Sequence, residues 1–356
     1  MNKNLFDLYT DYLLCSFGPV TATGLSQLVD GAVSHDQITR LLAGEEQRSA
    51  HLWQKVKPLV RQVEAPEGVI IIDDTVAEKA YTDENELICW PWDNAKERPV
   101  KGINLLTALS RVGDVSLPVA FDLVTKTETY VDPKTKQEKR RSAISKNARF
   151  RTLVRACVHH QIPFQSVLAD LWYASAENFK FVVQVVKKHF VMPLKGNRKV
   201  ALSVEEQQAG RYTTVEQLAL IPGQTREIWV EDVPFALLLT KEVFTNKDGS
   251  TGERYVVTDD LTLDANRITK LYQKRWSVEV YHEALKQNAS LTKSPTRTET
   301  TQRNHLFASL CAYVKLESVK LKTGLNQFAL KSKIYAAALK TAYQELVNLA
   351  PVSLGA

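Results

Sequence analysis

Three acidic positions are spaced so that a folded α/β domain could bring them together. Asp73 ends the apolar run VIIID, with Asp74 and Thr75 directly after it, and Asp170 ends a second apolar segment, VLAD. Glu279 follows much later, in the segment YQKRWSVEVYHEALK. Carboxylates suit Mg²⁺, which keeps coordination positions for water and phosphate oxygens. Two such ions about 4 Å apart can activate a nucleophilic oxygen and stabilise the leaving oxygen of a phosphodiester.

Each of these acids also has an ordinary structural interpretation. An aspartate at the end of a strand often belongs to a turn or caps the next helix. Glu279 could be solvated, or it could pair with Arg275 four residues earlier on the same helix. One acid alone therefore identifies no site, and the interpretation depends on the order of the acids and on the residues around them.

The residues around Glu279 are more specific. Tyr272, Arg275 and Lys286 lie at offsets of −7, −4 and +7 from the glutamate. At 100° per residue, a continuous helix places these four side chains within about 60° of one another. One helix face would then present an acid, two cations and a phenol. Cations beside a metal-binding acid suit chemistry on the phosphates of a nucleic acid.

Apolar spacing predicts the elements that must position these residues. Residues 1–66 have the pattern of short helices, one of them capped by Ser34 and ending near Gly44. This pattern is compatible with a helix-turn-helix unit and equally with other small helical bundles. The elements expected next are a buried strand over 69–73, a hairpin over 101–124, a helix over 146–160, a strand ending at Asp170, a helix capped by Ser175 and a strand over 190–194.

The second half adds a β-rich stretch and more helices. Residues 196–258 contain the strand candidates VEQL, REIWVE and FALLLTKEVFT and a hairpin around Lys247-Asp248-Gly249. A long amphipathic helix is expected over 263–287, and further helices over 302–349. The polar segment 125–141 shows no periodicity, so we expect a mobile loop there; its five Lys and Arg residues within 134–141 could lie along DNA.

This order of elements predicts the fold class. Three strands, a helix, a strand, a helix and a strand, followed by a late helix, match an RNase H-like α/β core, among other α/β folds. We expect a mixed sheet flanked by helices, with a β-rich insertion and helical N- and C-terminal segments.

The sequence resembles the DDE transposases of bacterial insertion sequences, in the subgroup named for its Y-R-E-K helix. Four residues fill the signature Y-x2-R-x3-E-x6-K: Tyr272, Arg275, Glu279 and Lys286. The resemblance includes IDDT at 72–75, LADLWYAS at 168–175 and FTNKDGSTG at 244–252, and it extends over roughly residues 69–318.

The resemblance implies an RNase H-like catalytic domain with three catalytic acids, Asp74, Asp170 and Glu279, which bind Mg²⁺ or Mn²⁺, as two ions. Asp74 is preferred because the family's acid directly precedes the threonine, and Asp73 is its rival. Adjacent strand residues point to opposite faces, so only one of the two should be a ligand. Glu283, one turn after Glu279, is a weaker rival for the last position.

The resemblance also implies DNA contacts and a reaction. Tyr272, Arg275 and Lys286 would contact phosphates near the cleaved end, while Trp276 would lie near a displaced base or pack in the core. Water would hydrolyse a phosphodiester at the transposon end, and the freed 3′-OH would attack target DNA. The partners would be double-stranded DNA, both terminal repeats and target, and a second copy of the chain in a homodimer.

Five segments are expected on this basis. They are a helical DNA-binding segment (1–66), the first part of the catalytic core (67–195), a β-rich insertion (196–258), the last part of the core with the glutamate helix (259–318) and C-terminal helices (319–356).

Composition excludes some classes of protein and permits others. The 356 residues carry a net charge of +6, which permits a polyanionic partner. Four widely spaced cysteines without a C-x-x-C pair argue against a disulfide framework or structural zinc and fit a reducing compartment. We find neither a secretion signal nor an apolar stretch of the roughly 20 residues that a membrane helix needs. We therefore expect a cytoplasmic bacterial protein that associates with the nucleoid when bound to DNA.

Other functions stay open at this point. The chain could be a catalytically silent transposase remnant that only binds DNA, or a metal-dependent nuclease without strand transfer. A small-molecule α/β enzyme is less favoured, because the sequence lacks G-x-G-x-x-G, Walker A and G-x-S-x-G motifs.

Overall fold

The computed structural model describes residues 2–93, 96–246 and 248–349, so Lys247 of the expected hairpin lies outside the described residues. The chain divides into two compact units. The sheet unit is Ser49–Tyr281, and the helical unit combines Met1–Arg48 with His282–Ala356.

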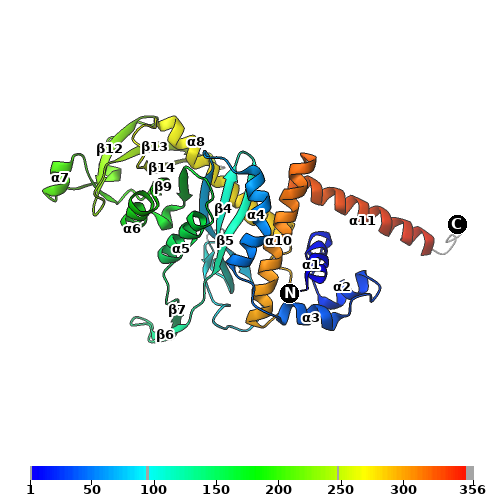
Figure 1. Cartoon of the computed structure of the whole chain (residues 1–356). Helices are drawn as coiled ribbons and strands as arrows, with labels where there is room; N and C mark the ends of the chain where they lie inside the picture. The colour runs from blue at the N-terminus through cyan, green and yellow to red at the C-terminus, as the bar shows by residue number, and fades with distance from the viewer. Residues whose placement is uncertain (1, 94–95, 247, 350–356) are drawn as a thin grey trace. The chain divides into compact units, whose positions relative to one another are not determined.

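The sheet unit is built on a ten-stranded mixed sheet with the order β11-β10-β12-β13-β14-β9-β8-β1-β4-β5 (Figure 1). The strands are β1 (Val69–Glu78), β4 (Gly102–Val112), β5 (Val115–Leu123), β8 (Ser166–Ala169), β9 (His189–Leu194), β10 (Lys199–Ala201), β11 (Thr213–Thr214), β12 (Thr225–Val230), β13 (Leu237–Thr245) and β14 (Thr251–Thr258). Strands β1, β8 and β9 are parallel; β4 pairs antiparallel with β1, and β5 pairs antiparallel with β4. This arrangement confirms the expected RNase H-like α/β fold.

The apolar run that starts β1 accounts for its central place. Val69 to Asp73 are all buried, as a strand covered on both faces requires. Strands β4 and β5 form the expected hairpin, and Gly113 at its turn has a φ of 54°, which glycine adopts without strain.

Helices cover both faces of these strands. They are α4 (Ser49–Val63), α5 (Lys146–His159), α6 (Ala176–Lys180), α7 (Val204–Gln208) and α8 (Ala265–Gln273). Ser175 caps α6 through the Asn178 N–H, as expected, and a π-helical stretch, Phe181–Val186, continues it. Figure 1 shows α4 and α5 on opposite sides of β4 and β5.

The β-rich stretch extends the core sheet. Its strand β14 pairs antiparallel with β9, from Tyr255 opposite Leu194 to Thr258 opposite Val191. The strands expected from REIWVE and FALLLTKEVFT are present as β12 and β13. The prediction of a strand at VEQL is wrong, because Val215–Gln217 form a 3-10 turn. The Gln217 side chain accepts the Thr214 N–H and stabilises this turn.

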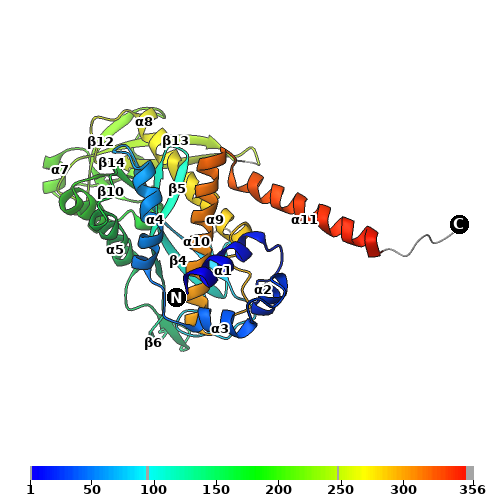
Figure 2. The same ribbon diagram turned by 45° about the vertical axis from the view of Figure 1, so that its right-hand side comes forward.

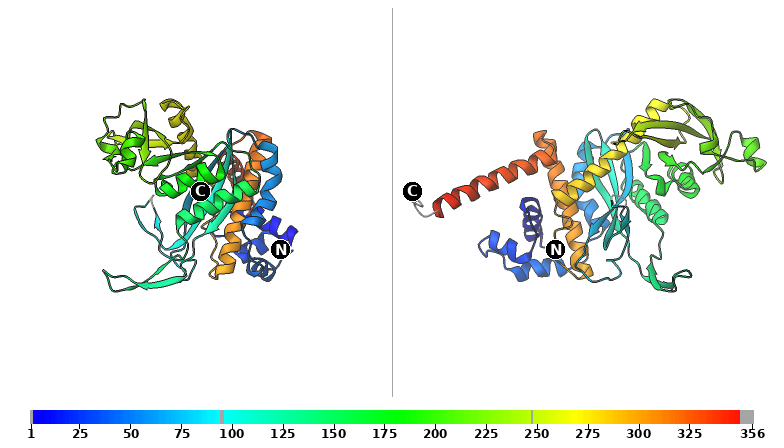
Figure 3. Two further views of the ribbon diagram at one scale, coloured as in Figure 1. Left: turned by 60° about the vertical axis from the view of Figure 1, so that its left-hand side comes forward. Right: turned by 180° about the vertical axis from the view of Figure 1, so that it is seen from behind.

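The polar segment 125–141 is also more regular than expected. Strands β6 (Glu128–Val131) and β7 (Glu138–Arg141) pair antiparallel in an exposed ribbon. Asp132 closes its turn by accepting the N–H groups of Lys134 and Thr135. Figure 3 shows the β6–β7 ribbon projecting from the sheet. Two further short strands, β2 (Trp92–Asp93) and β3 (Arg98–Pro99), also pair.

The expected helix over 263–287 is interrupted. Helix α8 ends at Gln273, Lys274–Trp276 form a 3-10 turn, and α9 spans Ser277–Gln287. The Ser277 hydroxyl donates to the Lys274 carbonyl oxygen at 2.8 Å, a local bond that competes with regular helix hydrogen bonding. The prediction that Tyr272 through Lys286 lie on one continuous helix, from which a single helix face was calculated, is therefore wrong.

The helical unit contains α1 (Lys3–Cys15), α2 (Ala22–Leu28), α3 (His35–Ala43), α10 (Glu299–Thr323) and α11 (Gln327–Leu349). Figure 2 shows α1 and α3 beside α10, and the buried Tyr9 hydroxyl lies 2.9 Å from His305 Nδ1. Ser34 caps α3 in a capping box with Gln37, as predicted. Within the described ranges, no helix is both long and apolar enough to cross a bilayer.

Candidate active site

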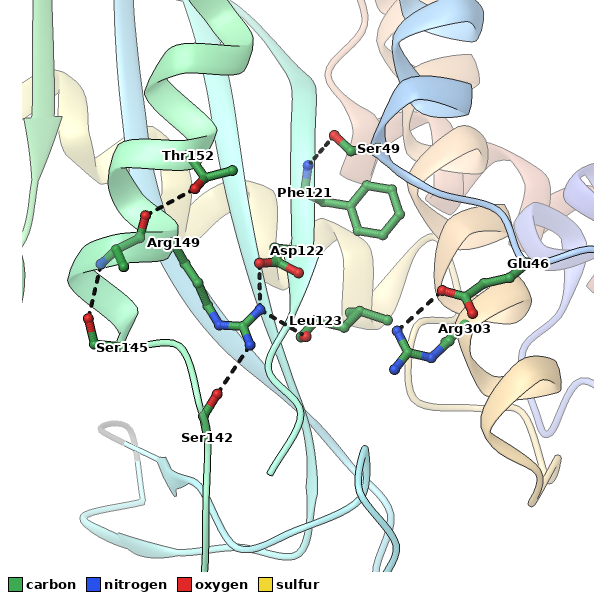
Figure 4. Close-up of polar contacts among 11 residues, drawn as sticks. Glu46, Ser49, Phe121, Asp122, Leu123, Ser142, Ser145, Arg149, Thr152 and Arg303 are labelled. Carbon is green, nitrogen blue, oxygen red and sulfur yellow. Dashed lines mark hydrogen bonds and ion pairs between the residues drawn. The ribbon is translucent and has the colours of Figure 1, made fainter. Parts of the chain in front are cut away.

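Asp73 and Asp74 of β1 face opposite sides of the sheet. Figure 4 shows β5, which lies beyond β4 from β1; there Asp122 pairs with Arg149 of α5 and the Phe121 N–H donates to Ser49 at the start of α4. Alternation along the strand therefore directs Asp122 toward α5 and Phe121 toward α4.

Strand pairing through β4 shows which residues of β1 lie on the same face as Asp122 and Phe121. Leu106 of β4 is opposite both Asp122 and Asp74, whereas Thr107 is opposite both Phe121 and Asp73. Asp74 therefore lies on the α5 side of the sheet and Asp73 on the α4 side.

Asp74 is held by three donors. Its Oδ2 accepts from Asn104 Nδ2 at 2.7 Å and from the Lys146 ammonium at 2.7 Å. Its Oδ1 accepts from the Tyr173 hydroxyl at 3.1 Å. Burial, reinforced by the Asp74 charge, raises the pKa of Tyr173 well above its ordinary value, so the phenol keeps the proton that it donates.

Asp73 and Glu279 share one guanidinium. Arg275 Nη1 lies 2.7 Å from Asp73 Oδ2, and its Nη2 lies 3.2 Å from Glu279 Oε1. Asp73 is 7% exposed, whereas Glu279 is open to solvent. Tyr281, also on α9, donates to Thr107 Oγ1 at 3.4 Å on the same side of the sheet as Asp73. The α9 glutamate and Asp73 are therefore linked through Arg275.

Asp170 lies at the end of β8, beside β1. Its Oδ1 accepts the Trp172 N–H at 2.9 Å and caps the 3-10 turn Leu171–Tyr173. Burial raises the pKa of Asp170, and the negative charge of Asp74 raises it further. Burial also raises the pKa of Asp73 to about 8, with Asp170 as the next cause, and Arg275 opposes the rise. Asp73 and Asp74 do not end their strand, contrary to the prediction from the sequence pattern, because β1 continues to Glu78. Asp170, at the end of β8, and the two β1 aspartates repel one another where burial limits their contact with water.

Two family models match the chain. The DDE superfamily endonuclease model covers residues 3–216, and the transposase DDE domain model covers residues 140–315. The chain belongs to the DDE superfamily of endonucleases. It is therefore a DDE nuclease or transposase, and its substrate is DNA. No curated protein matches it.

The acids of this DDE enzyme fit the divalent metal ions that the superfamily uses. Asp73, Asp170 and Glu279 offer hard oxygen donors, and a divalent cation would offset both the burial and the repulsion that raise the pKa values of Asp73 and Asp170. Within the described residues, no three acids form a preassembled metal-binding group. Arg275 instead contacts an oxygen of Asp73 and one of Glu279. A metal ion that used these two oxygens as ligands would therefore have to displace Arg275 from them.

The other residues that the resemblance assigns to DNA contact differ in their exposure. Tyr272 is 4% exposed, with the guanidinium groups of Arg254 and Arg275 5.1 and 5.9 Å from its ring centre. A direct phosphate contact by Tyr272 therefore fits poorly with its burial, and its contacts suit a role in holding Arg275. Trp276 is 59% exposed, so the alternative of core packing is wrong for it. Lys286 is half-buried near the end of α9.

Sequence reasoning missed the three residues that donate hydrogen bonds to Asp74 in the candidate site: Asn104, Lys146 and Tyr173. Asn104 could have been noticed, because it is a polar residue inside the apolar run of β4. A buried amide normally has a hydrogen-bond partner, here Asp74. Lys146 and Tyr173 gave no comparable signal, since a lysine in a first helical turn and a tyrosine after an aspartate are both ordinary.

Asp73 should make the stability of the metal-free protein depend on pH. Its pKa is about 8 in the folded chain against an ordinary 3.8, so between these values the folded chain binds more protons than the unfolded chain. Stability should therefore fall as the pH rises from about 4 to about 8 and then level off. Thermal unfolding in EDTA should show the wild-type Tm falling relative to Asp73→Asn across this range. Parallel Tm curves for the two proteins would contradict this prediction.

Proposed function

We propose that this DDE enzyme is a transposase that hydrolyses a phosphodiester at each transposon end and then joins the freed 3′-OH to target DNA. The observation that carries the proposal is the link from Asp73 through Arg275 to Glu279, with Asp170 at the end of the adjoining strand. A metal-binding acid next to a phosphate-binding cation is the arrangement that such a reaction needs.

We assign the catalytic ligands to Asp73, Asp170 and Glu279. Asp73 replaces Asp74, the sequence-based preference, because Asp73 shares Arg275 with Glu279. Asp74 instead receives three donors, among them Lys146 and Tyr173. Asp74 would then hold Lys146 and Tyr173 in place beside the metal ligands, as residues that orient metal ligands commonly do.

The side chains would act as follows. When bound, two Mg²⁺ or Mn²⁺ ions would activate the attacking oxygen and stabilise the leaving one. Arg275, released from the two carboxylates, would bind phosphate oxygens of the DNA in bidentate fashion. Tyr272 would keep the guanidinium in place, and Lys286 and Trp276 would contact DNA farther along the strand.

The finer partner assignments are also proposals. We propose that the enzyme acts as a homodimer on transposon ends, with the α1–α3 segment binding DNA, and that it associates with the bacterial nucleoid. Helix α11 supports self-association, because it exposes large apolar side chains at helical spacing, including Tyr335, Leu339, Tyr343 and Leu346. Light scattering with and without DNA would measure the stoichiometry.

The decisive experiment uses the full chain and DNA that carries the sequences flanking its own gene. Strand breaks and joined products are mapped to the nucleotide with Mg²⁺, with Mn²⁺ and with EDTA. Metal-dependent breaks at a repeat boundary, followed by joining, are expected. Breaks without joining would leave a nuclease, and DNA binding without breaks would leave a silent remnant.

We also propose that the β6–β7 ribbon contacts DNA. Lys139 and Arg141 pair with acids of the ribbon. No ion pair to Lys134, Lys136 or Arg140 occurs in the part of the chain that the structure describes. A two-stranded ribbon also fits the major groove of DNA.

Removal of these three free charges should weaken DNA binding in a salt-dependent way. The triple alanine variant of Lys134, Lys136 and Arg140 should reduce the slope of log K against log salt by up to about 2.7, or ~0.9 for each lost phosphate contact. A matched control replaces three exposed lysines of the helical unit, Lys322, Lys333 and Lys340. Equal slopes for the ribbon variant and the wild type would refute the contact.

A further inference from the structure

A pocket of about 340 Å³ opens in the sheet unit beside Asp170. Leu171 and Trp172 line it from the turn that Asp170 caps. Lys195 and Arg198 line it from the connection between β9 and β10, and Lys199 lines it from the start of β10. This volume is at the lower end of the ~300–1,000 Å³ typical of small-molecule sites, which suits a single nucleotide.

The lining of the pocket favours an anion. Three cations, Lys195, Arg198 and Lys199, face one acid, Glu231. An excess of cationic side chains over acids favours a ligand that brings anionic oxygens. Phosphate oxygens meet this requirement.

The same pocket offers an aromatic surface. The backbone N–H of Trp172 donates to Asp170 Oδ1, which keeps Trp172 close to this acid. The residue is nevertheless 65% exposed. The Lys146 ammonium, which pairs with Asp74, lies 5.8 Å from the centre of the Trp172 ring system. Exposed aromatic rings beside cations bind single-stranded nucleic acid by stacking on bases. A base inside a duplex already has stacking neighbours, so only an unpaired base can stack on such a ring.

We propose that this pocket binds one unpaired nucleotide of a DNA strand that passes Asp170, with its phosphate on Arg198, Lys195 and Lys199 and its base on Trp172. The inference rests on the proposed function for the presence of a DNA strand at Asp170. The pocket adds the chemical form of the ligand: a nucleotide outside the duplex, next to the cleaved phosphodiester.

The test measures binding of the full-length protein, in EDTA, to a short single-stranded oligonucleotide that contains 2-aminopurine, and to the blunt duplex of the same sequence. Trp172→Ala and Arg198→Ala should each weaken single-strand binding about tenfold and leave duplex binding unchanged. Trp172→Phe should retain part of the affinity, because it keeps an aromatic ring. Trp92→Ala is the matched control, since Trp92 is 57% exposed in the same unit and outside the pocket.

The outcomes separate the pocket from the proposed function. Wild-type single-strand affinity in both pocket variants would overturn the pocket, even if the enzyme cleaves DNA with metal. Equal losses for single strand and duplex would overturn the assignment to an unpaired nucleotide. Conversely, single-strand binding that depends on Trp172 and Arg198, in a protein that cleaves no DNA, would support the pocket and count against the transposase.

Discussion

Replacement of Glu279 with Gln should lower the rate of metal-dependent DNA cleavage by at least ~1,000-fold. Stabilisation of the transition-state charge by bound metal is worth several kcal/mol, and each 1.36 kcal/mol corresponds to a factor of ten. Glutamine keeps the length of the side chain but loses the charge that would hold the metal. The rate is measured on DNA with the flanking sequences of the gene, at saturating Mg²⁺ and then Mn²⁺.

DNA binding should survive this substitution. Glu279 is exposed and pairs with Arg275 Nη2, so its neutralisation frees this nitrogen for a phosphate oxygen. We expect unchanged or slightly tighter DNA binding by Glu279→Gln in EDTA. Loss of cleavage together with loss of binding would instead indicate a folding defect, which thermal unfolding would reveal.

Glu283 provides the matched control. It lies one turn later on α9, is exposed, and accepts a hydrogen bond from Gln287 at 2.9 Å. Glu283→Gln therefore makes the same chemical change on the same helix, and cleavage should stay at the wild-type rate. Full activity in Glu279→Gln, or inactivity in Glu283→Gln alone, would move the helix-borne ligand from the first position to the second.

The fold was largely predictable because its central strands carry strong local signals. The run from Val69 to Asp73 is apolar up to its last residue, so both faces of this strand were expected to be buried. Gly113 marked the turn between β4 and β5, and Ser175 marked the start of α6. These features depend on residues close together in the chain, and a sequence pattern reports them directly.

The errors arose where a few side chains changed the local backbone. Asp132 closes the turn of the β6–β7 ribbon, although the charged sequence there has no apolar alternation. Gln217 folds back on Thr214 and makes a 3-10 turn from an apparent strand. Ser277 bonds to the Lys274 carbonyl beside the break between α8 and α9. Such bonds are individually weak and have no periodic signature in the sequence.

The candidate site shows the same limit at the level of tertiary packing. Alternation along β1 established that Asp73 and Asp74 face opposite sides of the sheet. Which side receives α9 depends on contacts far apart in the chain, such as Tyr281 with Thr107. The family pattern placed the acid before Thr75, whereas the contacts place Arg275 and Glu279 with Asp73.

The pair Asp73→Asn and Asp74→Asn tests this assignment. Asp73→Asn should lower cleavage by at least ~1,000-fold, for the reason given for Glu279. Asp74→Asn should lower it by about 10–100-fold, the usual effect of removing a residue that orients metal ligands. The smaller loss is expected because Asn104, Lys146 and Tyr173 lose a charged acceptor while the metal ligands remain.

Metal binding gives a second readout that does not depend on cleavage. A ligand that binds only the folded state raises the Tm as its concentration rises. Addition of Mg²⁺ or Mn²⁺ should therefore stabilise the wild type and Asp74→Asn, and it should have little effect on Asp73→Asn. The reverse pattern would return the ligand to Asp74. Lys146 and Tyr173 would then have to release its oxygens before metal could bind, just as Arg275 must release Asp73 in the arrangement proposed here.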